Sequence, residues 1–160
     1  MATPVERRKL RFASLDEALT DADQLVAAES AGKLRHTGSW ELGQTLCHVA
    51  TWAELPFTGY PPEVHAPLPV RMILRLIRGV ILNKGMTTGV KIGKIPGGTL
   101  GTEKIDHHAG ADRLRDAFGR LKSQCPTTVN PVFGVLTHDQ WIQLNLRHAE
   151  LHLSFQIPQH

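Results

Sequence analysis

The sequence predicts an all-α protein, a four-helix bundle with a long crossover between its second and third bundle helices. Four segments carry apolar residues at three- and four-residue spacing, the pattern of a helix that packs one face on a core. Serine or threonine residues that can cap a helix precede three of these segments. Between the second and third segments lies a very apolar run followed by loops rich in glycine and proline, and this stretch is the predicted crossover.

Length and composition indicate a soluble globular protein with one domain, residues 1–160. A chain of this size can bury about 70% of its unfolded surface in a single core. The hydrophobic share of 41% and the charged share of 21% are ordinary. The net charge of +3 does not indicate a nucleic-acid partner, and none is expected.

Cysteine use and the lack of export signals predict a cytoplasmic protein. Cys47 and Cys125 do not have the spacing of a disulfide framework, which favours a reducing compartment. The stretch from Met1 to Arg11 is basic but lacks the apolar segment of a signal peptide. No run reaches the ~18 apolar residues that a membrane-spanning helix needs, so no transmembrane segment is expected.

The first helix is predicted to begin after Ser14, which can cap it. Asp16 and Glu17 lie favourably in its first turn, at the positive end of the helix dipole. Its apolar face runs to about Ala28 and consists of Leu15, Ala18, Leu19, Ala22, Leu25 and Val26. The segment Ala31-Gly32-Lys33 ends it.

The second helix is expected to have Ser39 as its cap and to end at Pro56 and the turn Tyr60-Pro61-Pro62. Its core stripe consists of Trp40, Leu42, Leu46, Val49 and Ala53. A neighbouring stripe at four-residue steps consists of Gln44, His48 and Trp52. Cys47 projects about 100° away from His48 around the helix, so the thiol is not expected to bind the same ion.

The crossover begins with a further apolar helix, predicted from Leu68 to Leu82. Arginines lie at helical spacing on one side of it: Arg71, Arg75 and Arg78. No acidic residue occurs between Glu63 and Glu103. This basic segment has several interpretations: a patch for an anionic substrate, a membrane-surface helix, a partner surface, or a connection that lies on the bundle with its arginines solvated.

The apolar residues of this helix cover more than half of its circumference: Leu68, Met72, Ile73, Leu76, Ile77, Val80 and Ile81. Exposing even half of them would leave a patch of several hundred Å², which soluble monomers seldom carry. We therefore predict that this face is buried against the bundle or against a second copy of the chain, in a homodimer. The arginine stems are expected to shield its edges while their guanidinium groups stay in water.

The third and last bundle helices follow the crossover. His107 and His108 are expected in the loop before the third helix, whose apolar face consists of Leu114, Ala117, Phe118 and Leu121 and which ends near Gln124. The segment from Asn130 to Leu136 is predicted to be a loop with apolar side chains that plug the bundle. Thr137 then starts the last helix, with Gln140 at the capping-box position.

His148 and His152 are four residues apart in the last helix and so leave the same helix face. Two imidazoles at this spacing can bind one divalent ion at ~2.1 Å each. Glu150 points to roughly the opposite side, so this is not the zinc-peptidase motif His-Glu-x-x-His. The spacing alone is also compatible with an alternative to a metal site, a pair of partly buried surface histidines that bind no metal.

Two segments of the chain resemble the DinB-like (YfiT-like) superfamily of metal-binding helical bundles. One is Trp40-Glu41-Leu42-Gly43-Gln44-Thr45-Leu46-Cys47-His48. The other runs from Asn130-Pro131-Val132-Phe133-Gly134 through His148-Ala149-Glu150-Leu151-His152, and it is similar to an uncharacterised branch, a domain of unknown function. The resemblance spans nearly the whole chain. It implies a DinB-like bundle in which a histidine of the second helix and a spaced pair of the last helix bind a divalent metal.

Carried over to this sequence, the implied ligands are His48, His148 and His152, and the other histidines are not expected to be ligands: His36, His65, His107, His108, His138 and His160. Three neutral imidazoles leave at least one position of the ion open, as in catalytic sites. Zinc or nickel is the expected metal, and iron is possible, since imidazole suits several metals. Gln44 and Asn145 lie one turn from His48 and His148, where they are candidates to contact the ligands or the substrate.

The resemblance also implies a reaction, thiol-dependent S-transfer or isomerisation of a small-molecule substrate with a low-molecular-weight thiol. A metal-dependent hydrolase is one alternative. It is weakened because no carboxylate is well placed as a general base. A non-catalytic metal- or ligand-binding protein with a basic docking helix is the other.

Overall fold

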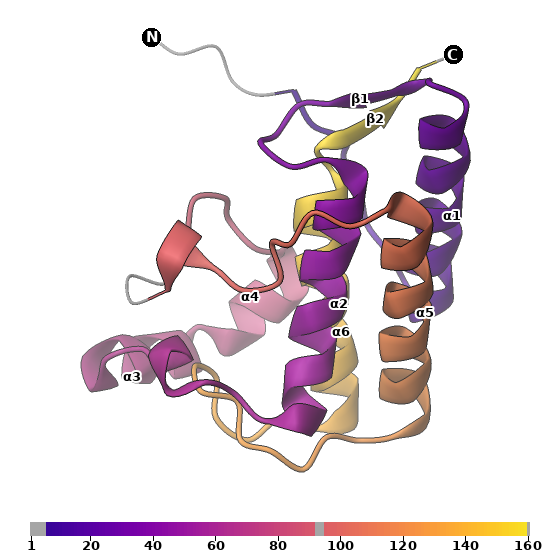
Figure 1. Cartoon of the computed structure of the whole chain (residues 1–160). Helices are drawn as coiled ribbons and strands as arrows, with labels where there is room; N and C mark the ends of the chain where they lie inside the picture. Colours follow the sequence, from indigo (N-terminus) through magenta and orange to yellow (C-terminus); the bar gives the residue numbers. More distant parts are fainter. Residues whose placement is uncertain (1–5, 92–94, 160) are drawn as a thin grey trace, which may run out of the picture.

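The computed structural model describes residues 6–91 and 95–159. Four long helices lie side by side (Figure 1): α1 (Leu15–Ser30), α2 (Leu42–Thr58), α5 (His107–Ser123) and α6 (His138–Leu153). The crossover between α2 and α5 carries η1 (Pro62–Val64), α3 (Leu68–Leu76), α4 (Arg78–Lys84) and η2 (Pro96–Gly98). The prediction of an all-α bundle with a long crossover is confirmed.

Helix α2 packs against both α5 and α6, and small residues bring α2 and α5 close together. A Cβ atom at Gly43 would lie 1.9 Å from the carbonyl oxygen of Ile105, and one at Gly110 would lie 3.0 Å from the Cβ of Leu46. Larger residues at either position would therefore push the helices apart. The core around them consists of buried apolar side chains that include Leu25, Leu42, Leu114, Phe118 and Trp141.

The predicted caps of the first and last helices are confirmed. Ser14 accepts a hydrogen bond from the backbone N–H of Glu17, and Thr137 and Gln140 form the reciprocal bonds of a capping box. Helix α5 begins earlier than predicted, because Asp106 caps it by accepting from the backbone N–H groups of His108 and Ala109. His107 and His108 therefore lie in its first turn and not in the preceding loop.

Helix α2 differs from the prediction at both ends. It begins at Leu42 with Glu41 at the N-cap, so Ser39 is not its cap and Trp40 precedes it. The side-chain oxygen of Gln44 accepts from the backbone N–H of Glu41 at 3.4 Å. Pro56 lies inside the helix, which runs on to Thr58. Proline has no N–H to donate to the carbonyl oxygen four residues earlier, so the helix lacks the hydrogen bond to Trp52 near its C-terminal end.

A short antiparallel pair of strands that the sequence pattern did not indicate joins the two halves of the chain. β1 (Leu34–His36) pairs with β2 (Gln156–Pro158), with Leu34 opposite Pro158. The buried side chain of Gln156 donates to Thr45 Oγ1 at 2.9 Å and to the carbonyl oxygen of Trp40 at 3.2 Å. These bonds hold the end of α6 next to the start of α2.

The prediction of one continuous helix from Leu68 to Leu82 is wrong, and the bundle does not cover its apolar face. The helix is broken at Ile77 into α3 and α4. The apolar face is not covered by the bundle, since Leu76 is 85% exposed and Leu68 is 64% exposed, although Leu82 is buried. Arg78 instead faces the protein and donates to the carbonyl oxygens of two loop residues, Phe133 and Val135.

Membrane crossing can be judged for the described helices. None of the helices within residues 6–91 and 95–159 combines the length and the apolar character that a bilayer span requires. The apolar run of the crossover is divided between two short helices, α3 and α4, of nine and seven residues. A span needs about 20 residues in one helix.

Candidate metal centre

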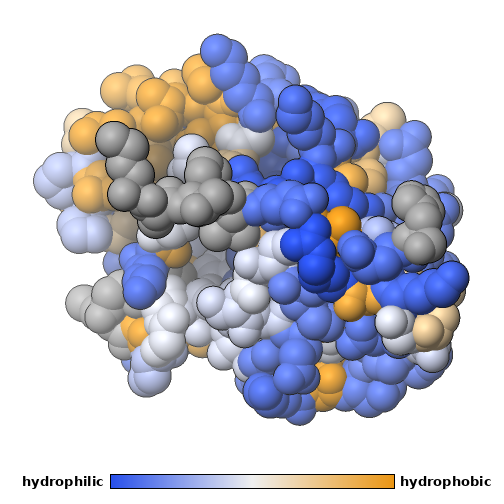
Figure 2. All heavy atoms as spheres, turned by 90° about the horizontal axis from the view of Figure 1, so that it is seen from above, coloured by the Kyte–Doolittle hydropathy of each residue, from blue (hydrophilic) through white to orange (hydrophobic). Residues whose placement is uncertain are grey.

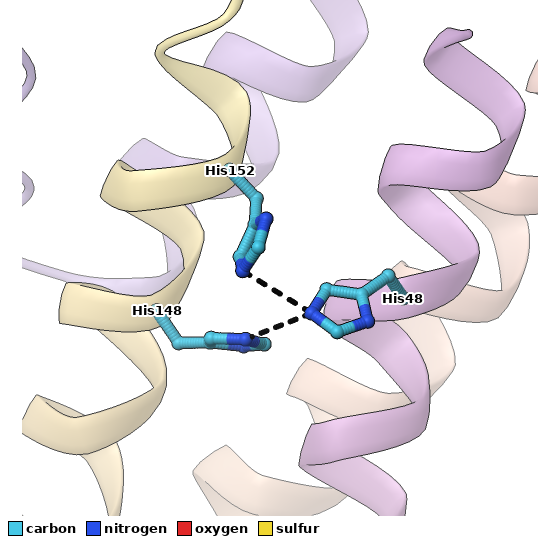
Figure 3. Close-up of side chains that lie close together, drawn as sticks. All are labelled: His48, His148 and His152. Atoms are coloured by element: carbon cyan, nitrogen blue, oxygen red, sulfur yellow. Dashed lines mark hydrogen bonds between the residues drawn. The ribbon is translucent and has the colours of Figure 1, made fainter. Parts of the chain in front are cut away.

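Three imidazoles meet between α2 and α6 (Figure 3). The Nε2 atom of His48 lies 3.1 Å from Nε2 of His148 and 3.2 Å from Nε2 of His152. One ligand nitrogen from each of the three residues lies within 4.8 Å of the others. His148 and His152 reach this point together because four residues bring a helix back to the same face. His48 reaches it because α2 packs against α6.

The crossover loop sets the orientation and the tautomer of His48. Nδ1 of His48 lies 2.7 Å from the carbonyl oxygen of Leu100. A carbonyl oxygen can only accept, so Nδ1 carries the proton and Nε2 of the neutral ring presents its lone pair to the other two histidines. This is the arrangement that a metal-binding histidine needs.

Gly101 allows the loop to approach α2 closely enough for this bond. Its φ of +71° is a left-handed conformation that glycine adopts without strain. A Cβ atom there would lie 2.4 Å from Oγ1 of Thr51, one helical turn from His48. The bond from His48 to the carbonyl of Leu100 and the contact of Gly101 with Thr51 could not be predicted from residue types. The one sequence signal for a close approach was the group of glycines at the end of the crossover, to which Gly101 belongs.

All three imidazoles are held in the neutral form. Burial lowers the pKa of His48 to about 4, although its bond to Leu100 acts in the opposite direction. Burial, followed by repulsion from His48, lowers the pKa of His152 to about 3. The pKa of His148 is also well below its ordinary value, first through burial and then through the two neighbouring imidazoles. Neutral imidazole is the form that binds a metal, so the cluster is ready for one at neutral pH.

The geometry of the cluster fits a divalent ion. Ligand nitrogens at ~2.1 Å from a tetrahedral ion lie about 3.4 Å apart, a few tenths of an ångström more than the two separations at His48. Without an ion, the lone pair of His48 Nε2 would have to accept from two N–H groups at once. Nδ1 of His148 is buried and has no hydrogen-bond partner in the described part of the chain. An ion at the shared point would satisfy the three Nε2 lone pairs together.

Two tryptophans form walls beside the imidazoles. The indole of Trp40 stacks on His152, with ring centroids 5.4 Å apart and an interplanar angle of 18°. The indole of Trp52 meets His48 and His148 edge-on, at centroid distances of 6.2 and 6.0 Å. The Nε1–H of Trp52 is buried and has no hydrogen-bond partner among the described residues. His148 and His152 remain partly exposed, so the cluster is not sealed from solvent.

The two other candidates have local hydrogen bonds. Gln44 donates to the carbonyl oxygen of Thr102 at 2.9 Å and so ties α2 to the loop that supports His48. Asn145 is buried and donates to the carbonyl oxygen of Trp141 in its own helix. Cys47 lies outside the imidazole cluster as predicted, with its sulfur 3.0 Å from Nη1 of Arg113, and burial raises the pKa of its thiol.

The remaining described histidines bond elsewhere. His36 contacts Gln156, His65 contacts Pro62, and His138 contacts Leu121. His107 and His108 both reach the hydroxyl of Ser30. None of these five belongs to the three-histidine group. His160 lies outside the described residues.

The fold and the cluster together define a class, a helical bundle with a three-histidine group between facing helices that could hold a metal ion. The chain belongs to the family described as protein of unknown function (DUF1569), whose model matches residues 5–159. Searches of curated proteins and of solved structures found no match. The predicted likeness to a domain-of-unknown-function family is thus confirmed.

The low pKa values of the imidazoles predict that acid destabilises the metal-free protein. Unfolded histidines take up protons near pH 6.5, whereas folded His48 and His152 do so only near pH 4 and pH 3. Between these values the unfolded chain binds more protons, so the free energy of unfolding falls as the pH falls from about 6.5. Burial of His48 alone accounts for a loss on the order of 1–2 kcal/mol between pH 6.5 and pH 5.

Urea unfolding of metal-free protein at pH 7.5, 6.5 and 5 measures this slope. The His48→Asn variant is the matched control, and its slope should be smaller because one of the shifted groups is gone. Equal stability of the unsubstituted protein at pH 7.5 and pH 5 would show that the imidazoles are hydrated and accept protons normally.

Proposed function

We propose that the protein is a metal-dependent enzyme of the DinB-like superfamily, with His48, His148 and His152 as the ligands of one divalent ion, zinc or nickel, with iron as a further possibility. The observation that carries this proposal is the convergence of three Nε2 atoms, one of which has its lone pair directed inward by the bond from Nδ1 to Leu100. Nitrogen ligands of this kind suit these metals and leave a coordination position for a substrate.

The proposed reaction is the transfer of a low-molecular-weight thiol to a small electrophilic substrate, or a thiol-dependent isomerisation. A bound divalent ion supplies Lewis acidity, which lowers the pKa of a thiol and favours its nucleophilic thiolate. In the transfer, the sulfur forms a bond to the electrophilic carbon, the leaving group departs with its electron pair, and the thiol proton passes to solvent. Trp40 and Trp52 restrict water on two sides of the site, and Leu100 keeps His48 in the ligand tautomer.

Thiol transfer is favoured over hydrolysis because the metal-ligand group found in the described residues contains three histidines and no carboxylate. Hydrolysis on a zinc-peptidase plan uses a carboxylate as general base beside the ion. The nearest glutamate on α6, Glu150, is buried on another face and binds Arg147 and the backbone N–H of Phe12. A hydrolase, or a binding protein without a reaction, is the alternative proposal.

The test combines metal analysis with a substrate screen. Protein purified without added metal is analysed for bound elements, and one equivalent of zinc or nickel is expected. A chromogenic aromatic electrophile is then supplied with and without cysteine as the thiol, and turnover is expected only with both thiol and metal. The His108→Ala variant, which removes an exposed imidazole outside the cluster, should keep the full rate. Metal-dependent cleavage of an ester without thiol would favour the hydrolase, and bound metal without turnover would favour the binding protein.

Two further expectations belong to this proposal. The enzyme is predicted to act in the cytoplasm, where low-molecular-weight thiols are kept reduced. It is also predicted to act as a homodimer on a small molecule. Fractionation of the producing cells and measurement of the molar mass in solution test these two expectations.

A further inference from the structure

The outer face of the crossover is a continuous apolar surface, here called the crossover face. It consists of the exposed large hydrophobic residues of α3 and α4 and the residue between them: Leu68, Val70, Met72, Ile73, Leu76, Ile77 and Val80. Hydrophobic residues gather at one edge of the molecule in Figure 2. A single chain leaves each of these seven side chains between 41% and 85% exposed. Monomeric soluble proteins rarely expose an apolar patch of this extent.

The arginines of the crossover are turned away from this face. Arg78 donates to the carbonyl oxygens of Phe133 at 3.3 Å and of Val135 at 2.9 Å. The guanidinium of Arg75 lies over Gly134, where a Cβ atom would be 3.0 Å from its Nε. Nε of Arg71 is buried. Arg71 and Arg78 are half-buried and Arg75 remains exposed at the border of the face, while the seven side chains of the crossover face are themselves uncharged.

We propose that a second copy of the chain covers the crossover face, in a two-fold symmetric dimer in which α3 and α4 of each copy contact α3 and α4 of the other. The exposed area of these seven residues is on the order of 700 Å², comparable to the ~800 Å² that each partner buries in a standard protein interface. A two-fold contact matches the surface to itself, which an uncharged apolar face permits without bringing like charges together.

A lipid surface fits this face less well than a second copy does. Helices that lie on anionic membranes place lysine or arginine beside the apolar face, where the cations reach the lipid headgroups. Here the guanidinium of Arg78 is occupied by loop carbonyls and that of Arg75 lies against the backbone of Gly134. Of these arginines only Arg75 is exposed, so less cationic charge borders the face than the sequence pattern indicates.

The test measures molar mass by sedimentation and light scattering across a dilution series, without detergent. The unsubstituted protein is expected to be a dimer. The Leu76→Glu variant places a charge at the most exposed position of the face and is expected to weaken dimerisation about 100-fold, as loss of a central interface residue does. Ile73→Glu is a second variant at a 59% exposed position. Both side chains are exposed in the single chain, so circular dichroism and thermal unfolding of the resulting monomers should show an intact fold.

Ala27→Glu is the matched control, because it adds the same charge at an exposed position of α1, on the other side of the molecule in Figure 1. This variant should remain a dimer. A monomer at all concentrations, or a dimer that Leu76→Glu and Ile73→Glu leave intact, would overturn the proposal. Monomeric protein that binds vesicles of phosphatidylcholine and phosphatidylglycerol, with the crossover face protected there from hydrogen exchange, would assign the face to a membrane and overturn it as well.

Discussion

Replacement of His148 by alanine is expected to abolish tight metal binding while the bundle stays folded. His148 supplies one of three nitrogens at the shared point, and two remaining imidazoles on different helices bind an ion far more weakly. A loss of at least about 1000-fold in affinity follows if each ligand contributes a few kcal/mol, since 1.4 kcal/mol is a factor of ten. Competition with a chromogenic chelator measures the affinity directly.

The same substitution should change the stability of the metal-free protein by less than about 1 kcal/mol, far below the usual cost of truncating a core residue. Among the described residues Nδ1 of His148 has no hydrogen-bond partner, and its ring packs against two other imidazoles. Its removal therefore leaves a small cavity but also removes a buried polar atom without a partner. Metal-loaded protein should lose only the stabilisation that bound metal supplies. His108→Ala is the control for both measurements. A metal-free variant that unfolds several kcal/mol more easily would identify His148 as a packing residue.

Replacement of Glu150 by alanine is expected to cost about 3–5 kcal/mol of stability, because it leaves a buried guanidinium without its partner. Arg147 is 4% exposed and lies 2.9 Å from Oε1 of Glu150. The same carboxylate accepts from the backbone N–H of Phe12 at 2.7 Å, and Arg147 donates to the carbonyl oxygen of Phe12 at 2.9 Å. The pair thus fixes the segment before α1 onto α6.

Urea denaturation measures this loss, and two variants make the result specific. Asp23→Ala breaks the exposed ion pair with Arg115 and should cost at most about 1 kcal/mol. The double variant Arg147→Met with Glu150→Leu should recover only part of the loss, since it removes the unpaired buried guanidinium but leaves the backbone N–H and C=O of Phe12 without these partners. A loss of less than about 1 kcal/mol for Glu150→Ala would show that water reaches Arg147 and replaces the carboxylate.

The histidine pair shows how much of the site can be predicted from residue spacing. The positions of His148 and His152 on one helix face follow from the helical repeat alone, and the capping box at Thr137 placed the start of that helix correctly. His48 could be joined to them only through the family resemblance, because nothing in local spacing relates two residues that are a hundred positions apart. The carbonyl of Leu100 belongs to the backbone, so residue type carries no sign of it.

The crossover shows where pattern reasoning was incomplete. The spacing of apolar and basic residues correctly predicted a two-faced helical segment, but the same pattern fits a helix with either face turned to the protein. The expectation was that the bundle or a second copy of the chain buries the apolar face, and the structure excludes the bundle. The loop between α5 and α6 instead presents the carbonyl oxygens of Phe133 and Val135 to Arg78, and the segment is oriented by these bonds.

The amino-acid sequence by itself determined the helical class, the helices and caps of α1 and α6, and the shared face of His148 and His152, because these depend on contacts within a few residues. Only the tertiary structure decided that His48 meets that pair, that its Nε2 lone pair points inward, and that the apolar face of α3 and α4 points outward. These features depend on the packing of α2 on α6 and on loops that reach across the bundle. Such long-range contacts depend on how the whole core packs, and this packing cannot be predicted from the pattern of neighbouring residues.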